Sequence, residues 1–150
     1  VVGTGSREDE LRQTQQKLGL QERLLITGRR PYDEIPGLIA ASDVCLLPYH
    51  KVGMTHDIVP LKIFDYMAMG KPVISTRLLG MVEEFGDDNG VFYVDKPEDV
   101  VQKAIELVAQ EDLAEFGAKA GRFVQGNSWD SITDEFERII TDAIRKQRST

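Results

Sequence analysis

Short apolar runs alternate with helix-like segments along much of this 150-residue chain. The runs at Val44–Pro48, Pro72–Ser75 and Val91–Val94 are almost continuously apolar, which is typical of strands that are covered on both faces of a parallel sheet. The segments between them each have an apolar stripe at helical spacing. This alternation predicts an α/β fold in which helices flank a parallel sheet.

Two earlier apolar runs, Val1-Val2 and Leu24–Ile26, predict further strands, so we expect a Rossmann-like, doubly wound sheet of about five strands. From Glu111 onward only helical patterns remain, and they predict a helical C-terminal tail whose last helix is capped by Ser128. Helices are also expected over residues 7–18, 31–41, 79–85 and 96–109, the last with Val100, Ala104, Ile105 and Val108 facing inward.

Bulk composition narrows the function classes. A net charge of −7 argues against sequence-independent binding of nucleic acid. No apolar run approaches the roughly eighteen residues that a membrane span needs. Cys45 is the only cysteine, so neither an intramolecular disulfide nor a cysteine-rich zinc site is expected, and a cytoplasmic setting is the natural interpretation.

Ligands of open parallel sheets bind at the loops that follow the carboxyl ends of the strands. Three such loops are candidates here: residues 3–6, 28–31 and 49–60. Gly3 and Gly5 would let the backbone of the first loop approach a ligand, although a tight turn alone would also require glycine.

The third loop leads into a short helix that ends before Gly70, and Pro60 is expected to be its first residue. The amides of Leu61, Lys62 and Ile63 would then lack helical acceptors and could bind phosphate. Lys62 adds a cation at the same end. Its alternative role is an exposed ion pair with Asp65, one turn along the helix.

Two aspartates accompany this helix. Asp65 shares a helical side with apolar residues, so we expect it to be half-buried and to accept hydrogen bonds from ribose hydroxyls, or else from the backbone or Lys62. Asp57 could bind sugar hydroxyls or could be a turn residue. His50 and His56 flank the loop without the spacing of a metal site, so no metal is expected.

Taken together, several blocks of the chain resemble the C-terminal, donor-binding domain of retaining glycosyltransferases of family 4, which have the two-domain GT-B fold. The specific element is a pair of acids separated by seven residues, here Asp57 and Asp65, where the family usually has glutamates. The blocks are VVGTGSREDELRQTQQKLGL, LLITGRRPYDEIPGLIAASDVCLLP, PLKIFDYMAMGKPVIST and GVFYVDKPEDVVQKAIEL.

The resemblance implies a role for each candidate residue. It places the ribose on Asp65, the donor sugar on Asp57 as the catalytic-site acid, and the pyrophosphate on Ile58, Leu61 and Lys62. It places the base beside the Gly28-Arg29 loop, with Gly3 and Gly5 also at the donor site. The implied reaction transfers a sugar from UDP- or GDP-sugar with retention and without a metal or other cofactor, chiefly by stabilising the leaving diphosphate.

The resemblance also implies that residues 1–150 form one domain of a longer enzyme. The family's first strand, the upstream Arg and Lys that clamp the diphosphate, and the N-terminal acceptor domain are expected to be missing, so the fragment alone should be inactive. The acceptor is expected to be a glycan, a lipid or a small molecule.

Peripheral membrane association could come from the missing half. The last helix is expected to expose an apolar strip that meets that half or forms a dimer. Two alternatives remain: a non-transferring sugar-nucleotide epimerase on the same architecture, and a non-catalytic nucleotide-binding or scaffolding module.

Overall fold

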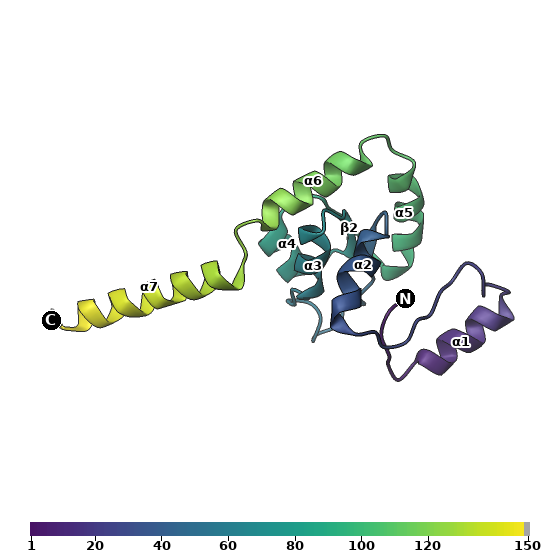
Figure 1. Ribbon diagram of the computed structural model, residues 1–150, viewed down its shortest axis with the longest axis horizontal. Coiled ribbons are helices and arrows are strands. Elements are labelled where there is room, and N and C mark those ends of the chain that lie inside the picture. The colour runs from purple at the N-terminus through teal and green to yellow at the C-terminus, as the bar shows by residue number, and fades with distance from the viewer. Residues whose placement is uncertain (149–150) are drawn as a thin grey trace. The chain divides into compact units, whose positions relative to one another are not determined.

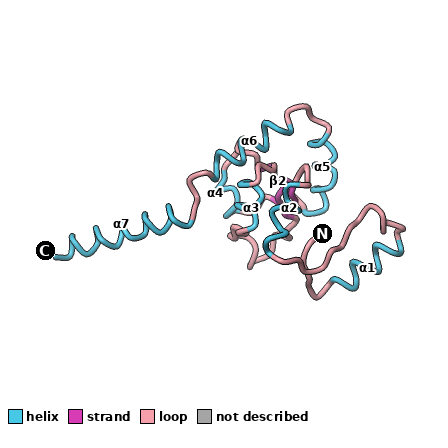
Figure 2. The backbone as a smooth tube through the Cα atoms, viewed as in Figure 1, coloured by secondary structure: helices cyan, strands magenta, loops and turns pink. Residues whose placement is uncertain are grey.

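The computed structural model describes residues 1–148, and the chain divides into two compact units, Val1–Leu38 and Ile39–Thr150 (Figure 1). The second unit contains a three-stranded parallel sheet made of β1 (Cys45–Leu47), β2 (Val73–Thr76) and β3 (Val91–Val94) in that order. The strands and the helices between them alternate along this unit, and Figure 2 shows the strand β2 among the surrounding helices. The predicted α/β class and parallel sheet are therefore confirmed.

The central strand, β2, is buried at all four positions because helices cover both faces of the sheet. On one face, Ile74 and Val94 pack against Val100 and Leu107 of α5 (Val100–Val108), which follows the short 3-10 helix η2 (Pro97–Asp99). On the other face, the Tyr93 hydroxyl donates to the Met81 carbonyl at 2.9 Å and so joins β3 to α4 (Leu79–Phe85).

Helix α5 corrects one prediction. Val100 and Leu107 are buried, whereas Ile105 and Val108, which we expected to face inward, are 58% and 46% exposed. The sequence offers two overlapping apolar stripes on this helix, and the sheet selects the one formed by Val100, Ala104 and Leu107.

Helices α3 (Lys62–Ala68) and α6 (Leu113–Val124) pack against each other in the same unit. Ile63 and Met67 are the buried residues of α3, and both are fully enclosed. The two residues are four apart, so they share one narrow side of this seven-residue helix. Every other position of α3 is at least partly accessible.

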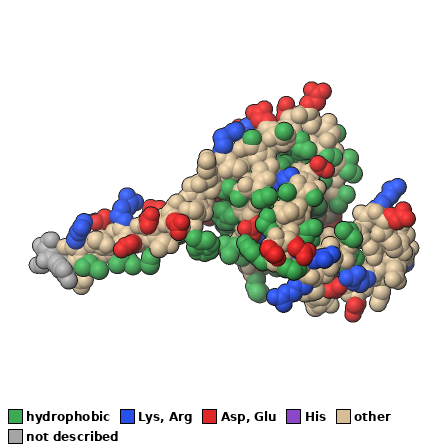
Figure 3. Space-filling model, in the orientation of Figure 1, with side chains coloured by type: hydrophobic (Ala, Val, Ile, Leu, Met, Phe, Trp, Pro, Cys, Tyr) green, Lys and Arg blue, Asp and Glu red, His purple; other side chains and the backbone are tan. Residues whose placement is uncertain are grey.

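The tail helix α7 (Trp129–Arg148) begins where predicted, since the Ser128 hydroxyl accepts the Ser131 amide at 3.1 Å as an N-cap. Its apolar side chains line one side of the helix and charged ones the other (Figure 3), and the predicted exposed apolar strip is confirmed. Within residues 1–148, no helix is both long and apolar enough to cross a bilayer. The strip comprises Trp129, Ile132, Phe136, Ile139, Ile140 and Ile144.

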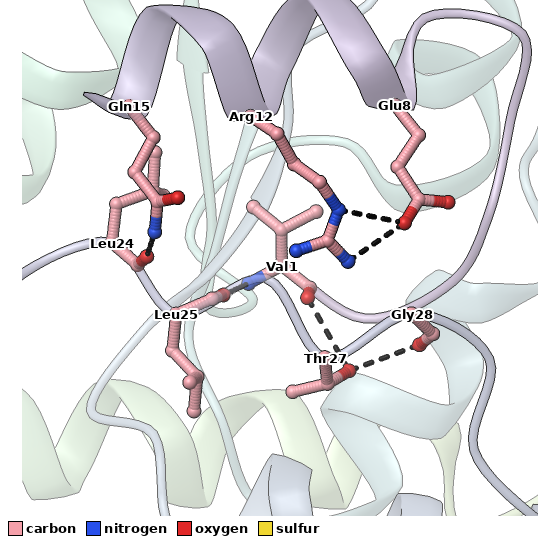
Figure 4. A network of polar contacts seen from close by, with 8 residues as sticks. All are labelled: Val1, Glu8, Arg12, Gln15, Leu24, Leu25, Thr27 and Gly28. Carbon is pink, nitrogen blue, oxygen red and sulfur yellow. Dashed lines mark hydrogen bonds and ion pairs between the residues drawn. The ribbon is translucent and has the colours of Figure 1, made fainter. Parts of the chain in front are cut away.

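The first unit contains α1 (Glu8–Lys17), the 3-10 helix η1 (Tyr32–Glu34) and the start of α2 (Ile35–Ala40). The segments at Val1 and Leu25 lie side by side. The Val1 amino group donates to the Leu25 carbonyl at 2.7 Å (Figure 4). The Thr27 amide also donates to the Val1 carbonyl, at 3.0 Å. Neither segment is a strand, so the prediction of about five strands is wrong for residues 1–148. Val1 and Leu25 are 63% and 70% exposed, and side chains without cover do not stabilise a regular ladder.

Candidate functional site

The loop between β1 and α3, residues 48–61, connects with the carboxyl ends of both other strands. Its His56 carbonyl accepts the Leu79 amide at 2.9 Å, just after β2. Its Lys51 ammonium lies 3.9 Å from the Asp95 carboxylate, just after β3. The loop therefore lies along the sheet edge where parallel-sheet proteins bind their ligands.

The middle of this loop is a compact turn. The Thr55 hydroxyl accepts the Val52 amide at 3.0 Å, and the His56 amide donates to the Val52 carbonyl at 3.0 Å. The Thr55 hydroxyl also donates to the His50 carbonyl. These bonds provide partners for backbone N–H and C=O groups within the loop. They also place His56 and Asp57 next to the start of α4.

Asp57 presents its carboxylate to solvent, with the side chain 74% exposed. One carboxylate oxygen lies 2.6 Å from Nδ1 of His56, and the second is left for another donor. The Asp57 backbone lies against Gly80, where an added Cβ would be 2.3 Å from the Asp57 carbonyl oxygen. The predicted site acid is thus fixed through both its backbone and its side chain.

The start of the short helix differs from the prediction. Helix α3 begins at Lys62 rather than Pro60, because Pro60 and Leu61 form a turn in which the Ile63 amide donates to the Pro60 carbonyl at 3.0 Å. Ile63 is therefore not a free donor. Among the backbone hydrogen bonds of residues 1–148, the amides of Leu61 and Lys62 have no acceptor, as predicted for these two positions.

One side-chain expectation at this helix is wrong, and one alternative is not observed. Asp65 is exposed rather than half-buried, because the buried side of α3 is formed by Ile63 and Met67 and Asp65 lies between them on the opposite side. Lys62 does not pair with Asp65 in the described structure. Its ammonium lies over the Tyr49 ring, 5.6 Å from the centroid, which is a cation–π contact.

The glycine loops of the first unit form a separate part of the predicted site. The Gly3 amide donates to the Gly28 carbonyl at 2.8 Å, and both glycines have positive φ angles, 117° and 67°, that side chains disfavour. Gly3 and Gly5 line an open cavity of about 460 Å³. The Arg29 side chain is exposed on the same unit.

Sequence reasoning missed Leu79 and Gly80, which contact the loop, and it also missed a contact between Arg77 and Tyr93 next to the sheet. The Arg77 guanidinium lies over the Tyr93 ring at 4.9 Å, and burial raises the pKa of Tyr93 to about 12. The sequence offered only a weak indication of the role of Leu79 and Gly80, namely that a glycine lies in the first turn of a helix that follows a strand. Within residues 1–148, the His, Cys, Asp and Glu side chains form no cluster of three that could hold a metal ion.

Comparison with known proteins gives a consistent result. The model of the family described as "Glycosyl transferases group 1" matches residues 1–110. A 2-deoxystreptamine N-acetyl-D-glucosaminyltransferase of Streptomyces fradiae is 28% identical over 86 residues, which are 57% of this chain and 19% of that protein. A 2-deoxystreptamine glucosyltransferase of Streptomyces kanamyceticus is 30% identical over 86 residues, or 57% of this chain and 21% of that protein.

Solved structures share the fold. A glycosyltransferase from Rickettsia africae superposes with a TM-score of 0.75 at 22% identity, covering 95% of this chain and 39% of that one. The Anabaena protein HepE, solved in complex with UDP, superposes with a TM-score of 0.70 at 22% identity, covering 94% of this chain and 40% of that one. The chain thus spans about a fifth of the curated relatives and two fifths of these structures.

Proposed function

The chain belongs to the glycosyl transferases of group 1 and has the fold of the C-terminal half of GT-B enzymes, and on that premise we propose that it binds the UDP- or GDP-sugar donor of a retaining glycosyltransferase. The observation that carries this proposal is the start of α3. The unpaired amides of Leu61 and Lys62 lie there between two exposed acids, Asp57 and Asp65, at the ligand-binding edge of the sheet.

Each part of the donor has a chemically suitable partner at this edge. The two free amides and the Lys62 ammonium supply positive charge for the diphosphate. The exposed Asp65 carboxylate can accept both ribose hydroxyls, and the free oxygen of Asp57 can accept a hydroxyl of the donor sugar. Ile58, next to Asp57, completes the segment that faces the diphosphate.

In the same proposal, the base of the nucleotide lies beside Gly28 and Arg29, with the backbone of Gly3 and Gly5 close to the donor. Gly3 and Gly5 line an open cavity and have no side chains, so a ligand can approach their backbone closely. Transfer proceeds mainly because fixed dipoles stabilise the charge that develops on the leaving diphosphate. HepE, which shares this fold, was solved with UDP and with UDP and glucose, which supports UDP as the first nucleotide to test.

The complete reaction also needs an acceptor. The relatives that match are several times longer than the matched segment, which supports the proposal that a separate domain binds the acceptor in the longer protein. Donor binding can nevertheless be tested on these 150 residues, and weak affinity is expected without the Arg and Lys clamp that the family resemblance places upstream.

The test is an NMR titration of the chain with UDP and GDP up to millimolar concentration. Chemical-shift changes should occur in residues 57–66, and at Gly28 and Arg29 where the base is proposed to lie. Asp65→Ala should weaken binding about tenfold or more, as expected for loss of a charge-assisted hydrogen bond. Asp134→Ala, an exposed aspartate on α7, should bind as the unmodified chain does. Shifts absent from residues 57–66 would contradict the proposal, and unchanged binding by Asp65→Ala would favour a scaffolding module.

A further inference from the structure

The contact between Asp57 and the first turn of α4 suggests how the site distinguishes the parts of its ligand. An ideal Cβ built on Gly80 would lie 2.3 Å from the Asp57 carbonyl oxygen, 2.7 Å from its carbonyl carbon and 3.1 Å from the Ile58 carbonyl oxygen. All three atoms are backbone atoms, so no side-chain rotation can relieve the clash. Any side chain at position 80 must displace the Asp57–Ile58 peptide.

Two further contacts hold the same segment. The Leu79 amide, one residue before Gly80, donates to the His56 carbonyl at 2.9 Å. The His56 imidazole lies 2.6 Å from one oxygen of the Asp57 carboxylate. The backbone on the N-terminal side of Asp57, the peptide on its C-terminal side and the carboxylate itself are therefore each restrained.

The restraint matters because Asp57 is otherwise free to move. Its side chain is 74% exposed and that of His56 is 55% exposed, so packing does not select a rotamer for the carboxylate. Asp65, in contrast, takes its position from α3, which rests on the buried Ile63 and Met67. The two acids of the site thus depend on different supports.

We propose that Gly80 and His56 are positioning residues that set the Asp57 carboxylate for the sugar of the donor, whereas binding of the nucleoside diphosphate depends chiefly on Leu61, Lys62 and Asp65. The inference rests on the proposed function. Gly80 acts by permitting the close approach of α4 to the loop, and His56 acts by orienting the carboxylate so that one oxygen remains available for a sugar hydroxyl.

The experiment compares the dissociation constants of UDP and UDP-glucose by NMR titration of the 150-residue chain and its variants. Gly80→Ala should weaken UDP-glucose binding about tenfold more than it weakens UDP binding, because the shifted Asp57–Ile58 peptide misplaces the Asp57 carboxylate while the Leu61 and Lys62 amides remain in place. The matched control is Gly53→Ala in the same loop, where an added Cβ meets no described atom within 4 Å and φ is not positive. This control should leave both constants unchanged.

His56 provides a test that does not disturb the backbone. His56→Leu removes the donor to the carboxylate and should reduce the relative affinity for UDP-glucose, and His56→Asn, whose amide can take the place of Nδ1, should restore it. The two His56 variants test the inference if Gly80→Ala does not fold. Unchanged UDP-glucose to UDP ratios in Gly80→Ala or, where that variant does not fold, in His56→Leu would overturn the inference. Absence of UDP binding by the unmodified chain would instead overturn the proposed function.

Discussion

Gly117 of α6 lies directly against Gly70, which follows the C-terminal end of α3. An ideal Cβ on Gly117 would be only 2.1 Å from the Gly70 carbonyl oxygen. This contact brings α6 onto the end of the helix that carries Lys62 and Asp65. The position of the candidate site therefore depends on two glycines that lie outside it.

Gly117→Ala should lower the free energy of unfolding by about 1–3 kcal/mol, because the new methyl group overlaps a backbone carbonyl. Helix propensity alone predicts the opposite sign, a gain of about 1 kcal/mol. Urea denaturation distinguishes the two. Gly126→Ala is the control, since its added Cβ meets no described atom within 4 Å and should change stability by less than about 0.5 kcal/mol.

Leu107 and Ile105 on α5 allow a direct comparison between a buried and an exposed aliphatic residue. Leu107 is fully buried in the core beneath the sheet, and Ile105 is 58% exposed. Leu107→Ala should cost about 2–4 kcal/mol of stability, and Ile105→Ala less than about 0.5 kcal/mol. Equal losses in thermal or chemical unfolding would mean that the stripe facing the sheet has been assigned wrongly.

Burial raises the pKa of Tyr93 to about 12, above the value near 10 of an exposed phenol. Between pH 10 and 12 the unfolded chain releases this proton and the folded chain retains it, so stability falls as the pH rises through this range. The loss should be roughly 1 kcal/mol, because solvent screens a half-exposed group.

Ultraviolet titration of the four tyrosines measures this effect directly. The highest transition should disappear in Tyr93→Phe, while the transition of Tyr66, whose pKa burial also raises, should remain. A Tyr93→Phe variant that retains the highest transition would assign it to a different phenol.

Substitutions in the apolar strip of α7 should affect the free energy of unfolding much less than substitutions in the core. Phe136 and Ile139 are 63% and 57% exposed, so Phe136→Gln combined with Ile139→Gln should leave the free energy of unfolding within about 0.5 kcal/mol. Self-association measured by sedimentation velocity should decrease, because exposed apolar area is removed. Glu137→Gln on the charged side serves as the control. A loss of more than about 1 kcal/mol would show that the strip packs within its own chain.

Local patterns predicted several elements closely. Val91–Val94 and Leu79–Phe85 were both predicted with the bounds that the structure has, because each is a short apolar segment bordered by glycine or by a change of pattern. The Ser128 cap was predicted because a hydroxyl before a helix accepts a free amide. In the candidate site, the free amides of Leu61 and Lys62 followed from Pro60 in the same way, even though the helix begins two residues later.

The α/β class, the order of most elements and the family could all be predicted from the amino-acid sequence, because they depend on apolar periodicity and on motifs that lie close together along the chain. Tertiary structure decided which stripe of α5 is buried, why Asp65 is exposed and how Asp57 is held. Those outcomes depend on contacts between residues such as Gly80 and Asp57, which are more than twenty positions apart and whose approach no local pattern encodes. The segments at Val1 and Leu25 show the same limit, since a strand requires neighbours that cover it as well as a sequence that favours it.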